Sequence, residues 1–299
     1  MLARLRRAAS LARAVRVRGR AASSARLINL NADMAEGYGP WAMTDDAGLL
    51  EIASTANVAC GGHAGDARQM ARVLGLAASK GASVGAHPGY DDKPGFGRRV
   101  IPLPHREIEE LVAVQTGALL GVARLARARA GFLHGIDVTH VKPHGALNNL
   151  ACVDAGVAAA IARAIAAVDE RLILLAPAGS ELLAAGAATG LPTASEVFAD
   201  RAYLADGTLA PRSMKGSVIH DPDAAAAHAV RLASGKPVKA LDTGADVVLR
   251  ADSVCVHGDK PEAVAQARRV RDALVGAGFR LATLPEVVAA SGGVDPMFK

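Results

Sequence analysis

The chain has 299 residues, of which 51% are hydrophobic and 21% charged. This length suits one α/β barrel of about 250 residues or two small domains, and the composition supplies a large core. The net charge of +5 comes from residues 1–26, which hold eight arginines and no acidic residue, so the remainder has 26 basic against 29 acidic residues. Because the body is weakly acidic, a nucleic-acid-binding function loses its main support.

The N-terminal segment 1–26 is rich in Arg, Ala and Ser, a composition typical of an organellar transit peptide and also of an over-extended start in a bacterial gene. We exclude this extension from the fold and expect residues 27–299 to form a single domain. No apolar run approaches the ~18 residues of a membrane helix. Cys60, Cys152 and Cys255 lack a Cys-x-x-Cys spacing, which favours reduced thiols and a cytoplasmic location, with an organelle as the alternative.

Short apolar runs alternate with helical patterns along the rest of the chain. The runs predict strands at 26–31, 56–60, 82–86, 139–143, 172–176, 195–199 and 253–257. A helical period joins Ile108, Leu111, Val112, Leu119 and Val122, and a similar one joins Val264, Ala267 and Leu274. Continuous apolar strands separated by helices favour a parallel sheet. Seven such units favour a closed (β/α) barrel, with an open doubly wound sheet as the alternative.

Four histidines share one setting at the ends of these strands. His63, His87, His144 and His257 each have a glycine within two residues and a helical pattern after them. The loops after the carboxyl ends of parallel strands open on one face and form the active site of such folds. A single histidine of this kind is more often a turn or core residue. The coincidence of four predicts a shared pocket.

Ionisable residues accompany these histidines at the same end. The segment INLNADMAEG contributes Asp33 and Glu36, and paired carboxylates divide acid and base roles or hold a divalent metal ion. Asp33, His63 and His144 are the candidate metal ligands. In VKPHG the proline keeps Lys142 extended on its strand and leaves His144 just past the strand end.

Two arginines are candidates for binding an anionic substrate. Arg98 and Arg201 carry planar guanidinium groups, which bind a carboxylate in two places. Asp66 stands three residues before Gln69 at the start of a helical pattern, so it is predicted to cap a helix. The chain has no phosphate loop, no G-x-G-x-x-G after the first strand and no G-x-S-x-G elbow. We recognise no nucleotide site in it.

Several long motifs occur in order over residues 27 to about 284. They are LNADMAEGYGPW, ANVACGGHAGD, GAHPGYDDKPGFGRR, HVKPHGALNN, EVFADRAYLADGTLAPRS and CVHGD, and together they resemble the LamB/YcsF family. This chain departs from the family pattern in having ADMAEG for a form nearer ADLGEG, CGGH where an aromatic residue often precedes the histidine, and ADRAY for ADRGY. None of these departures removes a candidate functional side chain.

The resemblance implies a distorted TIM-like barrel of the glycoside hydrolase/deacetylase type. It also implies an ATP-dependent opening of the 5-oxoproline ring to L-glutamate, carried out with two partner subunits, B and C, which would handle or share the nucleotide. We expect Asp33 or His63 to activate water, Lys142 to stabilise negative charge and His144 to protonate the departing nitrogen. The substrate-binding candidates are Glu36, His87, Arg98, Arg201 and His257. A metal-dependent amide or N-acetyl hydrolase and a non-catalytic subunit remain the alternatives.

Overall fold

The computed structural model describes residues 26–41, 43–129, 137–257 and 263–292. The Arg-rich extension lies outside the described residues except for Arg26, which begins the first strand.

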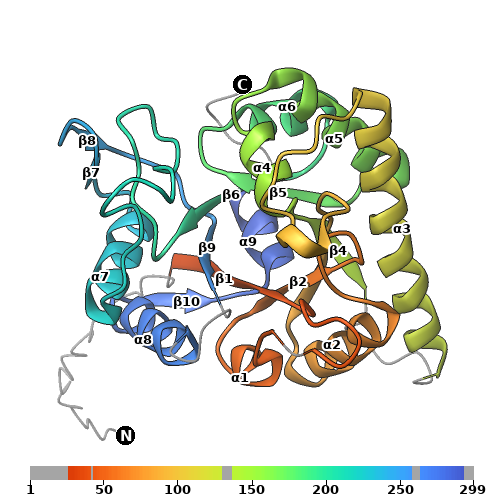
Figure 1. Ribbon diagram of the computed structural model, residues 1–299. Helices are drawn as coiled ribbons and strands as arrows, with labels where there is room; N and C mark the ends of the chain where they lie inside the picture. The colour runs from red at the N-terminus through yellow and green to blue at the C-terminus, as the bar shows by residue number, and fades with distance from the viewer. Residues whose placement is uncertain (1–25, 42, 130–136, 258–262, 293–299) are drawn as a thin grey trace, which may run out of the picture.

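Parallel strands form a closed barrel at the centre of the molecule (Figure 1). The barrel strands are β1 (Arg26–Met34), β2 (Thr55–Ala59), β3 (Ser83–His87), β4 (Val138–Val141), β5 (Ile173–Pro177), β6 (Thr193–Phe198) and β9 (Ser253–Val256). Each pairs with the next, and the pairing of β1 with β9 closes the ring. All seven predicted strands are present, which confirms the barrel over the open sheet.

Three further strands were not predicted. β10 (Phe279–Leu281) pairs with the first residues of β1, and β7 (Val238–Lys239) forms an antiparallel hairpin with β8 (Asp246–Val247). β1 has nine residues and pairs with two strands along the same edge. Arg26 to Ile28 pair with β10, and Asn29 to Ala32 pair with β9. β7, β8 and β10 have only two or three residues each, too few to show a hydrophobic period in the sequence.

Helices surround the barrel (Figure 1). They are α1 (Asp46–Leu50), α2 (Ala67–Lys80), the 3₁₀ turn η1 (Lys93–Gly95), α3 (His105–Arg129), α4 (Gly145–Ala151), α5 (Ala155–Val168), α6 (Glu181–Thr189), α7 (Pro222–Ala233), α8 (Ala263–Gly276) and α9 (Leu284–Ser291). Asp66 caps α2 as predicted, since its side chain accepts from the backbone N–H of Gln69.

α3 is long and apolar enough to cross a membrane by length and composition, and α4 with α5 passes the same test only as a pair bent by 115°. In this fold α3 packs against α2, α5 and β3. It buries Ile108, Val112 and Leu119, the face that the helical period predicted. We therefore describe α3 as a covering helix of the barrel.

α9 closes the end of the barrel at which the strands begin. Leu284 and Val288 pack with Ile173, Leu175 and Ala194, which lie near the starts of β5 and β6. The backbone N–H of Leu284 donates to the Ser83 hydroxyl at the first residue of β3. The opposite end, at which the strands finish, is not covered by α9 and is available for a functional site.

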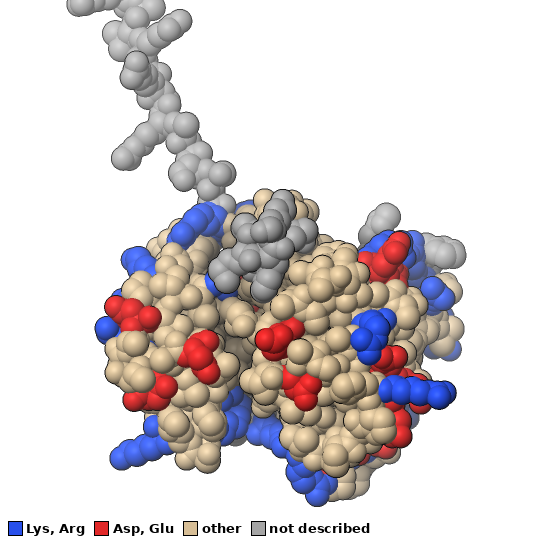
Figure 2. Space-filling view, turned by 90° about the horizontal axis from the view of Figure 1, so that it is seen from above, with Lys and Arg blue, Asp and Glu red and all other residues tan. Residues whose placement is uncertain are grey.

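Charges of both signs are scattered among uncharged residues over the face seen in Figure 2.

Candidate active site

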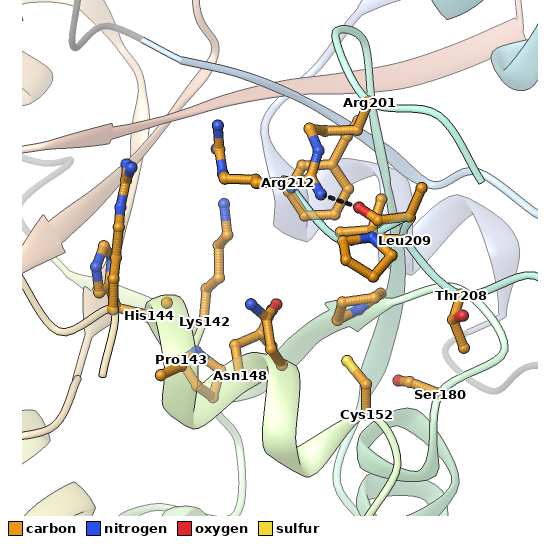
Figure 3. A pocket seen from close by; sticks show the side chains of 18 of the residues that line it. Lys142, Pro143, His144, Asn148, Cys152, Ser180, Arg201, Thr208, Leu209 and Arg212 are labelled. Carbon is orange, nitrogen blue, oxygen red and sulfur yellow. Dashed lines mark hydrogen bonds between the residues drawn. The ribbon is translucent and has the colours of Figure 1, made fainter. Parts of the chain in front are cut away.

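A cavity of about 560 Å³ opens at the carboxyl ends of the strands. The predicted site residues that line it are Asp33, Glu36, His87, Arg98, Lys142, His144, Arg201 and His257. Figure 3 shows Lys142, the residue after β4, and Asn148 of α4 in the cavity, together with Arg201 and Arg212 from the segment after β6. His63 is not part of the lining and lies behind His144, with the two ring centroids 3.6 Å apart.

Lys142 is the centre of a buried charge cluster. Its Nζ lies 2.9 Å from Asp33 Oδ1 and forms an ion pair at 2.8 Å with Glu196 Oε1. It also donates to Asn31 Oδ1 and to Cys255 Sγ, each at 3.3 Å. Burial alone would lower the pKa of Lys142, but Asp33 and Glu196 raise it, and the balance lies well above the usual value. Lys142 is therefore a fixed positive charge, as expected, although Glu196 was not predicted.

A chain of hydrogen bonds across three strands holds Asp33. Asn57 Nδ2 donates to Asp33 Oδ1 at 2.8 Å, and His140 Nε2 lies 2.9 Å from Asn57 Oδ1. Because a carboxylate only accepts, the Asn57 amide is oriented and its oxygen must accept from His140. Burial lowers the pKa of His140 to about 3, so this ring is neutral. Burial alone would raise the pKa of Asp33, but His87 and Lys142 hold it well below its usual value.

Glu36, His63, His87 and His144 form a buried group whose candidate ligand atoms lie within 4.8 Å of one another. This Glu/His₃ group could hold a metal ion. It differs from the predicted set of Asp33, His63 and His144. Asp33 is not a member of the group, although its Oδ2 lies 3.2 Å from His87 Nε2, and its Oδ1 contacts Lys142 and Asn57. Glu36 and His87 belong to the group and were not predicted as ligands.

His144 is poorly suited to the proton-donating role expected from the sequence. Burial, followed by the charges of His63 and His87, lowers its pKa well below the usual value. Its Nε2 lies 2.9 Å from the Phe96 carbonyl, which can only accept, so the one proton of a neutral ring is held there. Burial likewise lowers the pKa of His63. Both rings are neutral, which makes them poor proton donors.

His257 has the opposite environment. Its Nδ1 lies 2.8 Å from Asp200 Oδ2, and the ring lines the cavity. Burial alone would lower the pKa of His257, but Asp200 raises it above the usual value. Asp200 stands beside Arg201 in the ADRAY motif, where its role was missed. Gly258 and Asp259 of the CVHGD motif lie outside the described residues.

The segment after β6 supplies two guanidinium groups. Arg201 is 7% exposed, and its Nη2 donates to the Ala210 carbonyl at 2.6 Å. Burial, and next the charge of Arg212, lowers the pKa of Arg201. Arg212 lines the same cavity and was not predicted. Arg98 lies across the Phe96 ring, 5.5 Å from its centroid. Positive charges in one cavity favour an anionic ligand.

The loop that carries His63 depends on Gly65, whose φ is +81°. A Cβ there would lie 2.6 Å from the Ala59 carbonyl oxygen and 3.0 Å from that of Ala35, both rigid backbone atoms. We expect Gly65→Ala to lower the free energy of unfolding by about 3 kcal/mol, measured by urea denaturation. Gly75→Ala within α2 is the control, since its Cβ meets nothing within 4 Å. That change should raise stability by about 0.5–1 kcal/mol, and equal effects of the two would contradict the explanation.

The LamB/YcsF family model matches residues 28–289. The chain belongs to the LamB/YcsF family.

Relatives within this family cover nearly the whole barrel. The A subunit of the 5-oxoprolinase of Rhodopseudomonas palustris (strain BisB18) is 53% identical over 256 residues, which are 85% of this chain and 97% of the relative. The A subunit of the 5-oxoprolinase of Azoarcus sp. (strain BH72) is 47% identical over 260 residues, 87% of this chain and 98% of the relative. The crystal structure of a lactam utilization protein from Thermus thermophilus is 41% identical, with a TM-score of 0.78 over 86% of this chain and 99% of that chain.

The structure shows the backbone conformation at one of the positions where this chain departs from the LamB/YcsF pattern. Ala35, which stands where ADLGEG has glycine, adopts a φ of +59°, a left-handed conformation that costs an alanine about 1–2 kcal/mol. Its methyl group is fully buried. The turn between Asp33 and Glu36 therefore keeps the conformation suited to glycine despite the substitution.

Proposed function

We propose that this chain is the A subunit of a 5-oxoprolinase, a hydrolase that opens the cyclic amide of 5-oxoproline to give L-glutamate with ATP hydrolysis. The observation that carries the proposal is the positively charged Lys142, buried with carboxylates at the base of a cavity that also presents arginines. The names of the near-full-length relatives support it.

The chemistry explains why ATP and partners are needed. A five-membered lactam is a resonance-stabilised amide and a poor electrophile. Phosphorylation of its oxygen makes the ring carbon more electrophilic and couples ring opening to ATP hydrolysis. The sequence shows no phosphate loop, so we propose that two further subunits, B and C, handle the nucleotide.

We assign the following roles to the residues of the cavity around the scissile C–N bond. Lys142 provides fixed positive charge where the developing oxyanion forms. Asp33, an ionised hydrogen-bond acceptor at the same place, orients the attacking water, since His63 does not line the cavity. The water oxygen adds to the ring carbon that bears the phosphorylated oxygen and releases its proton through Asp33. When the C–N bond breaks, the nitrogen takes a proton from His257, which Asp200 keeps protonated. The acyl phosphate that remains reacts with a second water to give the glutamate carboxylate and inorganic phosphate. Arg201 and Arg212 bind the substrate carboxylate.

Glutamate release from 5-oxoproline tests this function. The assay compares the chain alone with the chain plus both partner subunits, each with and without ATP. We expect glutamate only from the complete mixture with ATP. Release that is unchanged when this chain is omitted would contradict the proposal.

Arg212 offers a test of carboxylate binding. Arg212→Ala should raise KM for 5-oxoproline about tenfold with little change in kcat, because one charged hydrogen bond to the substrate is lost in the ground and transition states alike. Steady-state kinetics of the reconstituted complex measure both constants. Arg271→Ala, a half-buried arginine on α8 that does not line the cavity, is the control and should change neither.

The Glu/His₃ group favours a second candidate, a metal-dependent amide or N-acetyl hydrolase. Such an enzyme would release product from an amide substrate without ATP and without partners, and a stoichiometric divalent ion would restore its activity. A non-catalytic subunit is the third candidate. It would be supported if variants at Lys142, His144 and His257 all left the activity of the complex intact.

A further inference from the structure

Two hydrogen bonds locate the protons of a close histidine pair. His87 Nδ1 lies 2.7 Å from the Lys142 carbonyl oxygen, and His144 Nε2 lies 2.9 Å from that of Phe96. A carbonyl oxygen only accepts, so both of these nitrogens carry a proton. The other two nitrogens, His87 Nε2 and His144 Nδ1, face each other at 2.9 Å. In neutral rings both would present lone pairs, which repel at this distance, so a positive charge belongs between them.

That charge is either a proton on His87 or a metal ion. Asp33 Oδ2 lies 3.2 Å from His87 Nε2 and would stabilise either one. A proton on His87, however, would provide no partner for the buried polar atoms of His63 and Glu36. Both ring nitrogens of His63 are buried without a hydrogen-bond partner among the described residues. Glu36 Oε1 lies 3.5 Å from His63 Nε2 and 3.7 Å from His144 Nδ1. A metal ion engages all four side chains at once.

We propose that Glu36, His63, His87 and His144 bind one divalent metal ion of the zinc class. Three imidazoles and one carboxylate are donors that suit this class. Neighbouring ligand atoms in a tetrahedral zinc site lie about 3.4 Å apart, from bonds of about 2.0–2.1 Å, and the spacings here bracket that value. The carbonyl partners of His87 and His144 are the outer contacts that orient metal-binding histidines. The proposal is independent of the substrate.

Binding of one ion requires the His63 ring to turn. The His63 ring is parallel to His144, so it must turn for both nitrogens to reach one ion, and no hydrogen bond of the described residues opposes that turn. Glycines flank the two rings. A Cβ on Gly89 would lie 2.7 Å from His63 Nδ1, and a Cβ on Gly97 would lie 2.8 Å from His144 Cδ2. Side chains at these positions would collide with the two rings, so the glycines allow the histidines to lie where they do.

Metal binding itself is the test. The full chain is stripped with a chelator, loaded with Zn²⁺ and desalted, and its metal content is measured by mass spectrometry. We expect one equivalent per chain, a zinc-dependent rise in Tm, and visible absorption bands when Co²⁺ replaces zinc. His63→Ala and the isosteric Glu36→Gln should weaken zinc binding by at least about 100-fold in calorimetric titrations. His220→Ala, an exposed histidine outside the group, should bind like the unaltered chain.

Two results would overturn the proposal of a metal site. Less than about a tenth of an equivalent of zinc on the loaded chain would overturn the proposal. So would full zinc binding by the folded Glu36→Gln and His63→Ala variants. If the loaded chain holds too little zinc, an imidazolium N–H resonance from His87 in the metal-free chain would show that a proton lies between His87 Nε2 and His144 Nδ1. Because these readouts need no turnover, they stand whether or not the chain acts on 5-oxoproline.

Discussion

Lys142→Met is expected to lower ring-opening turnover in the reconstituted complex by at least about 1000-fold. Methionine has a similar length but removes the positive charge that Asp33 and Glu196 share in the base of the cavity. The developing oxyanion then faces buried carboxylates without a cation. Glutamate release under saturating 5-oxoproline and ATP measures the loss. Near-normal turnover would contradict the assignment of Lys142 as the group that stabilises the oxyanion.

Folding must be separated from chemistry in this variant. Removing one partner of a buried ion pair destabilises a protein by about 3–5 kcal/mol, because the other partner stays buried and unpaired. The double variant Lys142→Met with Glu196→Gln removes one of the stranded carboxylates and should recover part of the Tm without recovering activity. Lys80→Met is the matched control, since Lys80 pairs with Glu51 at the surface, and it should leave turnover unchanged. Recovery of activity in the double variant would contradict the role of Lys142.

His257→Gln is expected to lower kcat by about 100-fold to 10,000-fold, the usual contribution of a general acid. Glutamine fills a similar volume but cannot donate a proton to the departing nitrogen and keep its bond to Asp200. His144→Gln tests the role first expected from the sequence. His220→Gln, on an exposed site, controls for substitution itself. Comparable losses in the His257 and His220 variants would contradict the assignment.

The pH profile gives an independent check on His257. The pKa of His257 reflects burial, which lowers it, and the charges of Asp200 and Asp33, which raise it, with a smaller lowering by Lys142. The acid is active when protonated, so activity falls as pH rises through the raised pKa. Asp200→Asn removes the largest raising charge, and the alkaline limb of kcat/KM should move to lower pH. An unmoved limb would show that another group donates the proton.

The barrel was predictable because its signal is local. Each core strand is a short apolar run between helical patterns, and burial on both faces makes that run continuous, as in β5 and β6. The hairpin of β7 and β8 carries no such signal, and β10 exists because the first residues of β1 extend beyond their pairing with β9. Those elements depend on neighbours distant in sequence.

The site was partly predictable for a similar reason. His87, His144 and His257 line one cavity because parallel strands finish on the same side, whereas His63 lies behind His144. Glu196 and His140 were missed because they lie within strands, where only the register of the barrel shows which side chains meet. Arg212 was missed because its place depends on the path of the segment after β6.

The sequence by itself determined the seven core strands, the end of the sheet that carries the site and the membership of Lys142 and His257 in that site, since these follow from apolar runs, chain direction and residue type. Only the tertiary structure decided what each group does. His144 and His257 occupy equivalent strand ends, yet one meets a carbonyl and other imidazoles while the other meets Asp200. Proton affinity depends on burial and on charges a few ångströms away, and those distances exist only after the barrel has closed.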